Sequence, residues 1–102
     1  MREDGGPALK VNVRLAAALQ EHAGRAPVLE LDLAPPVTVG AVLDAVATNH
    51  PAIGRRLRDE GGTLRRHVNV FVGPDNARDL QGADTVVGEG VEVAVLPAIS
   101  GG

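Results

Sequence analysis

The chain has 102 residues with 10 Lys and Arg against 13 Asp and Glu, and its formal net charge of -3 argues against general nucleic-acid binding. It contains no cysteine, which excludes disulfides, thiolate metal sites and a cysteine nucleophile. Hydrophobic residues make up 44% of the chain, enough for one small core, but no apolar run approaches the roughly 18 residues that crossing a membrane requires.

The first residues are polar and are interrupted by glycine and proline. Residues 1–7 are therefore predicted to form a disordered arm. They show no signal-peptide pattern, so we expect a cytoplasmic protein. Residues 8–97 are expected to form one domain, and residues 98–102 are expected to form a tail after it.

The first part of the domain is predicted to contain two strands joined by a short helix. Apolar and polar residues alternate over residues 8–15 and again over residues 28–33, which predicts two half-buried strands. The connection over residues 16–23 is rich in helix formers and is followed by Gly24, a residue that often terminates helices. The two strands are expected to pair as a hairpin.

The main helix is predicted to begin after Thr38, a good N-cap residue, and to end before Pro51. Apolar side chains recur along one stripe of this segment: Val39, Val42, Leu43, Val46 and Ala47. Pro51 can also open a second short helix over residues 52–58, before Gly61 and Gly62 interrupt the chain.

Two more strands are predicted in the last third of the chain. Residues 67–72 alternate, and the sole aromatic residue, Phe71, falls on the face opposite the valines. Phe71 either marks a partner contact or is covered by the loop that follows. We favour the second interpretation. Residues 73–90 are predicted to be a turn and a loop. Residues 91–96 alternate again and are followed by Pro97, which cannot donate to a sheet ladder and is expected to end the strand.

This order of elements predicts an α+β fold. It suits a mixed sheet of four or five strands wrapped over one main helix, which is the β-grasp or ubiquitin-like roll. The first and last strands would be parallel neighbours in the centre of that sheet. The last strand would then lead into a flexible tail that ends in Gly101 and Gly102.

The side chains offer little chemistry of their own. The three histidines are scattered at positions 22, 50 and 67, without the short spacing of a metal site. No glycine-rich phosphate loop is present, and Ser100 has no base near it in the sequence. We therefore predict no autonomous enzyme and no bound metal or cofactor.

The remaining reactive group is the carboxylate of Gly102. Two glycines let an extended tail enter a slot too narrow for side chains. There, ATP could activate the carboxylate as an acyl-adenylate, and a sulfur nucleophile could displace AMP to give a thiocarboxylate. A terminal Gly-Gly arises by chance in roughly one chain in 200, but here it follows a predicted strand closely.

Half of the basic residues fall within twelve positions: Arg55, Arg56, Arg58, Arg65 and Arg66. This cluster is either a solvated face, partly neutralised by Asp59 and Glu60, or a docking patch for an acidic partner. We favour the solvated face.

Several segments resemble the MoaD/ThiS family of ubiquitin-like sulfur carriers. They are Pro-Val-Thr-Val-Gly-Ala-Val-Leu at 36–43, Asn-His-Pro at 49–51, Val-Asn-Val-Phe-Val at 68–72 and the closing block at 88–102. The similarity covers nearly the whole chain from Ala8. Arg-Arg before His-Val-Asn-Val-Phe-Val, together with the long loop at 73–87, is most similar to the CysO-type carriers of actinobacteria, which serve cysteine synthesis. One departure is Val91 after Gly90, where the family commonly has Gly-Asp.

The resemblance implies a monomeric carrier that an E1-like (MoeB/ThiF-type) enzyme adenylates with its own ATP and Mg²⁺. Gly102 would carry the thiocarboxylate, and Gly101 would be its threading neighbour. The residues lining the partner groove would be Leu96, Pro97, Ala98, Ile99 and Ser100. The acceptor would be a CysM-type cysteine synthase, a MoaE-type molybdopterin synthase subunit, a thiazole synthase or a thiosugar synthase.

Two other functions are compatible with this chain. A ubiquitin-like modifier would be joined through Gly102 to lysines of other proteins. A stand-alone β-grasp binding module would not need the diglycine. Deleting Gly102 would abolish the carrier and modifier functions and leave a binding module unchanged.

Overall fold

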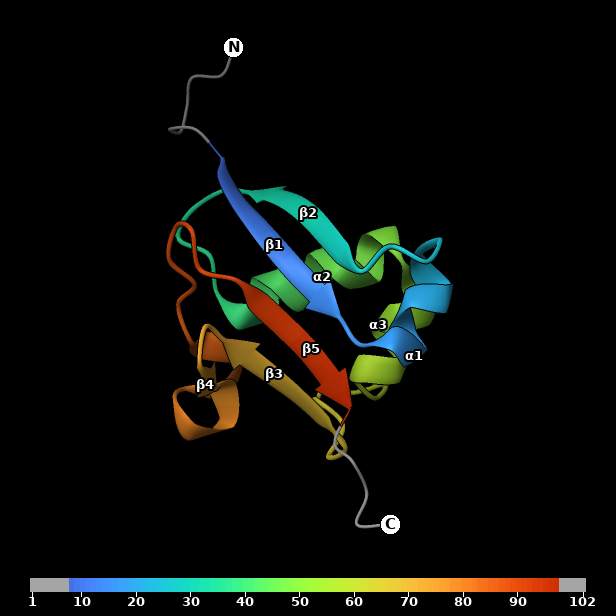
Figure 1. Cartoon of the computed structure of the whole chain (residues 1–102). Helices are drawn as coiled ribbons and strands as arrows, with labels where there is room; N and C mark the ends of the chain where they lie inside the picture. The colour runs from blue at the N-terminus through green and yellow to red at the C-terminus, as the bar shows by residue number, and fades with distance from the viewer. Residues whose placement is uncertain (1–7, 98–102) are drawn as a thin grey trace.

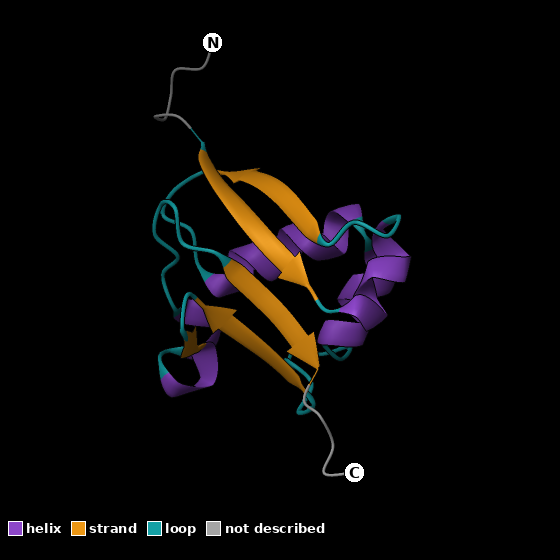
Figure 2. Cartoon of the chain, in the orientation of Figure 1, coloured by secondary structure: helices purple, strands orange, loops and turns teal. Residues whose placement is uncertain are grey.

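A computed structural model describes residues 8–97 as one mixed sheet with helices packed on one of its faces (Figures 1 and 2). The strands are β1 (Leu9–Leu15), β2 (Val28–Leu33), β3 (Val68–Val72), β4 (Asp75–Asn76) and β5 (Val93–Pro97). The helices are α1 (Ala17–Gln20), α2 (Val39–Asn49) and α3 (Pro51–Leu57), with 3₁₀ turns η1 (Glu21–Ala23), η2 (Ala77–Asp79) and η3 (Gly82–Asp84). The predicted arm, residues 1–7, and the predicted tail, residues 98–102, lie outside the described residues.

The five strands are arranged in the order β2-β1-β5-β3-β4. β1 and β2 form the predicted antiparallel hairpin, with Leu9 opposite Leu33. β1 and β5 are parallel neighbours, and β5 also pairs antiparallel with β3. This arrangement confirms the predicted β-grasp roll, in which the central strand β5 has a partner on each side.

The core lies between the sheet and α2. Alternate residues of each strand face the helices, because side chains of a strand point to opposite faces in turn. The side chains with no exposed surface are Val11, Val13, Val42, Val46, Ile53, Val70, Val93 and Val95. Ala47, predicted as part of the apolar stripe, is half-buried.

The helix boundaries follow the predicted signals closely. The Thr38 hydroxyl accepts a hydrogen bond from the Ala41 N–H at 3.2 Å, so Thr38 is the N-cap of α2. Pro51 is the first residue of α3, which ends at Leu57 because Arg58 has an extended backbone. Gly24 terminates η1 with a left-handed backbone, as predicted. None of the described helices has the length and hydropathy that a membrane span requires.

Residues 73–90 contain more structure than the predicted turn and loop. The chain folds back after Gly73, and β4 pairs with Phe71 and Val72 at the edge of the sheet. The turns η2 and η3 follow, and the Thr85 carbonyl accepts a hydrogen bond from the Val39 N–H at 2.9 Å. These elements are too short to have a periodic pattern, so the sequence did not indicate them.

The boundaries of β3 and β5 differ from the prediction. β3 begins at Val68, because the Val68 N–H donates to the Arg65 carbonyl in a turn. β5 begins at Val93, two residues later than predicted, since the N–H of Val91 and the carbonyl of Glu92 are used in other turn contacts. Pro97 belongs to β5 and does not stand after it. Proline lacks the donor but keeps its carbonyl acceptor, so it can occupy the last paired position.

Candidate functional site at the end of the central strand

The end of β5 is held on both sides. Pro97 lies opposite Val68 of β3, and Leu15 of β1 lies beside Val95. The Ala16 N–H adds a hydrogen bond to the Val95 carbonyl at 3.2 Å. The body of the protein therefore fixes the point from which residues 98–102 continue, at one end of the sheet (Figure 1).

The residues predicted to line a partner groove divide into two groups. Leu96 is half-buried and lies on the sheet face opposite the core, because its neighbour Val95 is fully buried. Pro97 is in the ladder of β5. The residues outside the described part of the chain are Ala98, Ile99, Ser100, Gly101 and Gly102. Their roles remain predictions.

Phe71 lies close to Leu96 on the outer face of the sheet. Phe71 pairs with Ala94, and Asn69 pairs with Leu96, so these half-buried residues occupy adjacent rows. On its other side Phe71 pairs with Asn76 of β4, whose side-chain amide donates to the Asn69 side chain at 3.2 Å. A short edge strand therefore flanks the aromatic ring, which stays partly exposed.

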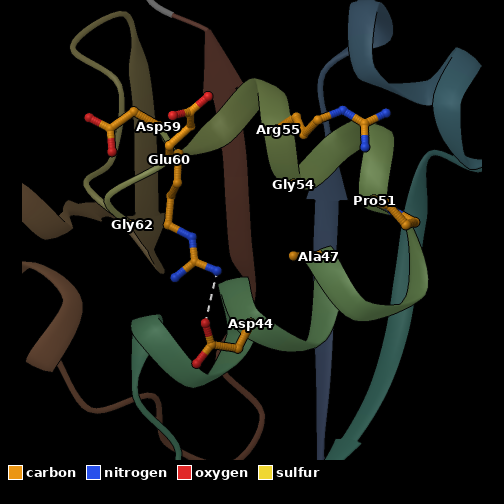
Figure 3. Close-up of a pocket in the computed structure, with 9 residues that line it drawn as sticks. Asp44, Ala47, Pro51, Gly54, Arg55, Asp59, Glu60 and Gly62 are labelled. Carbon is orange, nitrogen blue, oxygen red and sulfur yellow. Dashed lines mark ion pairs between the residues drawn. The ribbon is translucent and has the colours of Figure 1, made fainter.

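The arginine cluster does not act as one group. Arg58 is 21% exposed at its side chain, and its guanidinium lies 2.8 Å from the Asp44 carboxylate (Figure 3). The Arg65 Nε donates to the Arg55 carbonyl at 3.0 Å. Two of the five arginines thus stabilise the connection between α2, α3 and β3.

Asp59, one of the two acids predicted to neutralise the arginine cluster, is hydrogen-bonded to backbone groups instead. The Asp59 carboxylate accepts hydrogen bonds from the N–H groups of Gly61 and Thr63, so it stabilises the turn after α3. Arg55 faces a depression of about 460 Å³ between α2 and α3 that carries both signs of charge (Figure 3). Arg56 instead lines a second cavity together with His67. The cluster therefore spreads over two surfaces.

A comparison of the sequence with known protein families identifies the family of this chain. The sequence model of the ThiS family matches residues 13–102 of this chain. The chain belongs to the ThiS family. This confirms the predicted resemblance to ubiquitin-like sulfur carriers of the MoaD/ThiS type.

Three relatives of this ThiS-family chain are two sulfur carrier proteins and one small archaeal modifier protein. The sulfur carrier protein CysO of Mycobacterium tuberculosis is 37% identical over 67 residues, which cover 64% of this chain and 72% of that protein. The molybdopterin synthase sulfur carrier subunit of the same organism is 32% identical over 94 residues, covering 92% and 99%. Small archaeal modifier protein 1 of Haloferax volcanii is 37% identical over 89 residues, covering 87% and 97%.

Solved structures of the same kinds of protein share the fold. The crystal structure of small archaeal modifier protein 1 from Haloferax volcanii matches with a TM-score of 0.78 at 32% identity, covering 91% of this chain and 99% of that one. The crystal structure of the Amycolatopsis orientalis BexX/CysO complex matches with a TM-score of 0.77 at 33% identity, covering 90% and 99%.

Sequence reasoning missed one residue that supports the strand end of this ThiS-family chain. The Arg78 guanidinium donates from Nη2 to the carbonyls of Arg65 at 2.8 Å and of Val68 at 2.6 Å. It thereby ties η2 to the start of β3, directly opposite Pro97. The only local signal was Asn76, whose side chain accepts from the Arg78 N–H at 2.9 Å and caps η2.

The remaining polar groups do not suggest a second chemical site. Within residues 8–97, no three His, Cys, Asp or Glu residues lie close enough together to hold a metal ion. In the same part of the chain, every buried side-chain nitrogen and oxygen has a hydrogen-bond partner. The candidate site of this ThiS-family chain is the end of β5, where Pro97 pairs with Val68.

Proposed function

We propose that this chain is a sulfur carrier whose carboxylate at Gly102 is converted to a thiocarboxylate. The observation that carries the proposal is the position of Pro97. It ends a central strand that is paired on both sides, and only five residues follow it in the sequence. A short segment ending in Gly101 and Gly102 follows Pro97 in the sequence, and membership of the ThiS family supports a role for that segment.

The proposed chemistry has two steps. A carboxylate oxygen of Gly102 attacks the α-phosphorus of ATP, and pyrophosphate leaves, which gives an acyl-adenylate. Sulfide then attacks the carbonyl carbon, the bond to the AMP oxygen breaks, and loss of the sulfur proton leaves a thiocarboxylate. An E1-like enzyme supplies ATP and Mg²⁺. The glycines let the reacting carbon approach without a side-chain clash.

Cysteine synthesis is the pathway that we propose for the sulfur. The 37% identity to the sulfur carrier protein CysO over 67 residues supports a CysM-type acceptor. The longer match to a molybdopterin synthase carrier subunit, over 94 residues, supports a MoaE-type acceptor as the next choice.

Protein modification is the second candidate function. The match to small archaeal modifier protein 1, at 37% identity over 89 residues, favours it. Both functions share the adenylate at Gly102 and differ in the nucleophile, which is sulfide in one and a lysine amine in the other. Experiments on the product therefore separate the two.

The intact mass of the protein tests the carrier function. The full chain and a chain lacking Gly102 are each incubated with ATP, Mg²⁺, sulfide and an E1-like enzyme from the same organism. We expect only the full chain to gain the mass of one oxygen-to-sulfur exchange. If neither chain changes while the enzyme is active on another carrier, the proposal is wrong for this pair.

A tryptic digest of cell lysate tests protein modification. Neither Lys nor Arg follows Arg78, so residues 79–102 stay attached to any lysine that the chain has modified. If the chain is a carrier, no lysine peptides with this branch accumulate. Their accumulation, and their loss when Gly102 is deleted, would establish the modifier function instead.

A further inference from the structure

A cavity of about 220 Å³ opens beside the end of β5. Its lining residues come from α1, from α3, and from the turn and first residue of β3: Ala18, Leu19, Arg56, Leu57, His67 and Val68. We call it the strand-end pocket. Val68 is the residue opposite Pro97, and the segment leading into α1 is hydrogen-bonded to β5 through Ala16. The pocket is thus directly next to the point from which residues 98–102 continue.

The strand-end pocket has an apolar floor and a cationic edge. Leu19, Leu57 and Val68 belong to the hydrophobic core and form the floor. Arg56 and His67 are exposed at the edge. Arg66, next to His67 in the sequence, is exposed as well, and none of the described residues that line the pocket is acidic.

Two arginines are available to a partner here: Arg56 at the edge of the pocket, and Arg66, which precedes the lining residue His67 in the sequence. Within residues 8–97, no ion pair or side-chain hydrogen bond uses the guanidinium of Arg56 or Arg66, whereas that of Arg58 is paired with Asp44. The whole chain carries a net charge of -3, so this positive edge is a local reversal of sign. Such an edge attracts and orients an acidic partner.

We propose that the strand-end pocket docks an apolar side chain from an acidic segment of the enzyme that activates the tail. Drug-sized ligands need cavities of about 300–1,000 Å³, so a cavity of about 220 Å³ suits a single side chain better. The buried floor provides an anchor for that side chain, and the arginines pair with carboxylates beside it. The inference relies on the proposed function for its choice of partner.

Binding without chemistry tests the cationic edge. A chain lacking Gly102 is titrated into the E1-like enzyme by calorimetry without ATP, at low and high salt. We expect Arg56→Gln with Arg66→Gln to weaken binding about tenfold and to reduce its salt dependence. Arg25→Gln with Arg55→Gln is the matched control, since both residues are exposed, neither lines the pocket, and the net charge changes equally.

A second pair of variants tests the apolar floor. Ala18→Arg adds a positive charge but fills the pocket, whereas Ala17→Arg adds the same charge on the same helix outside it. Both alanines are exposed, so both variants are expected to fold. We expect Ala18→Arg to weaken binding about tenfold and Ala17→Arg to leave it unchanged or slightly tighter. Thermal unfolding by circular dichroism checks the fold of each variant.

Three outcomes would overturn the inference. Equal weakening by the two glutamine pairs would mean that only net charge matters. Binding of Ala18→Arg that is as tight as that of the unchanged chain would mean that no side chain enters the pocket. Self-association of the chain without enzyme, lost in the Arg56 and Arg66 variant, would identify a second copy as the occupant.

The same variants separate this inference from the proposed function. At saturating enzyme, the full-length Arg56 and Arg66 variant should still gain the mass of the oxygen-to-sulfur exchange, because Gly102 is intact. If the unchanged chain binds through the pocket but gains no sulfur, the carrier function fails and the docking inference stands. If the unchanged chain gains sulfur and the pocket variants bind normally, the docking inference fails and the carrier function stands.

Discussion

Gly54 of α3 packs against Ala47 of α2 with no room for a side chain. A Cβ built on Gly54 would lie 2.6 Å from the Cβ of Ala47 and 2.8 Å from its Cα. Because the second atom belongs to the backbone, rotating a side chain cannot relieve this clash. The crossing lies under the depression drawn in Figure 3, and it sets how α3 is positioned against α2.

Replacing Gly54 by alanine should therefore destabilise the protein. We expect Gly54→Ala to lower the free energy of unfolding by about 1–3 kcal/mol from overpacking, more than the gain of roughly 0.5–1 kcal/mol that alanine brings to a helix. Urea denaturation measures the change. Adding Ala47→Gly should recover part of the loss. Gly61→Ala is the control, since its Cβ would meet only Asp59 Oδ1 at 3.5 Å.

The N-cap of α2 offers a second measurement. Thr38→Ala removes the acceptor of the Ala41 N–H and should lower the free energy of unfolding by about 1 kcal/mol. Thr38→Ser keeps the hydroxyl and should lose much less. Thermal or urea unfolding of the three proteins makes the comparison. Equal loss in both variants would show that the methyl group of Thr38, not its hydroxyl, stabilises this end of the helix.

Arg78 is expected to hold the start of β3 in place. Arg78→Ala leaves the carbonyls of Arg65 and Val68 without this donor and should cost about 1–3 kcal/mol of unfolding free energy. Arg78→Lys should recover only part, because an ammonium lacks the planar fork of a guanidinium. Amide hydrogen exchange should become faster at Val68 and Asn69. Arg55→Ala, at an exposed position, should leave that exchange unchanged.

Two adjacent residues of β5 should separate stability from partner binding. Val95 is fully buried, and we expect Val95→Ala to cost about 2 kcal/mol or more of unfolding free energy. Leu96 is half-buried on the outer face, so Leu96→Ala should cost less than half as much. If Leu96 contacts the activating enzyme, its variant should raise the KM for thiocarboxylation with kcat unchanged. A normal KM would remove Leu96 from the partner surface.

Most of the fold follows from local patterns in the sequence. Alternation identified β1 and β2, the Thr38 hydroxyl marked the start of α2, and the apolar stripe of α2 faces the core with Ala47 at its margin. These signals depend on neighbours a few residues apart, and backbone geometry converts them directly into helices and strands. The β-grasp order followed from the sequence of these elements.

The contacts around the candidate site do not follow from such patterns. Asp44 neutralises Arg58, although Asp59 is the nearer acid in the sequence. Arg78 stabilises β3 from a segment predicted to be a loop. In each pair the partners are separated by ten or more residues. They meet only when α3 packs on α2 or when the chain folds back after β3, so no local spacing indicates them.

The sequence alone predicted the candidate reactive end of this protein, a strand followed by Gly101 and Gly102, and its motifs indicated no activated nucleophile or metal cluster elsewhere. Only the tertiary structure decided where that end begins and what lies beside it. Pro97 belongs to the ladder because it lies opposite Val68 of β3. Arg56 and His67 line one pocket because the segment before β3 folds back onto α3, where the Arg65 N–H donates to the Leu57 carbonyl at 2.8 Å. Local propensities act along the chain, whereas a ladder end and a pocket form only where distant segments bury surface together.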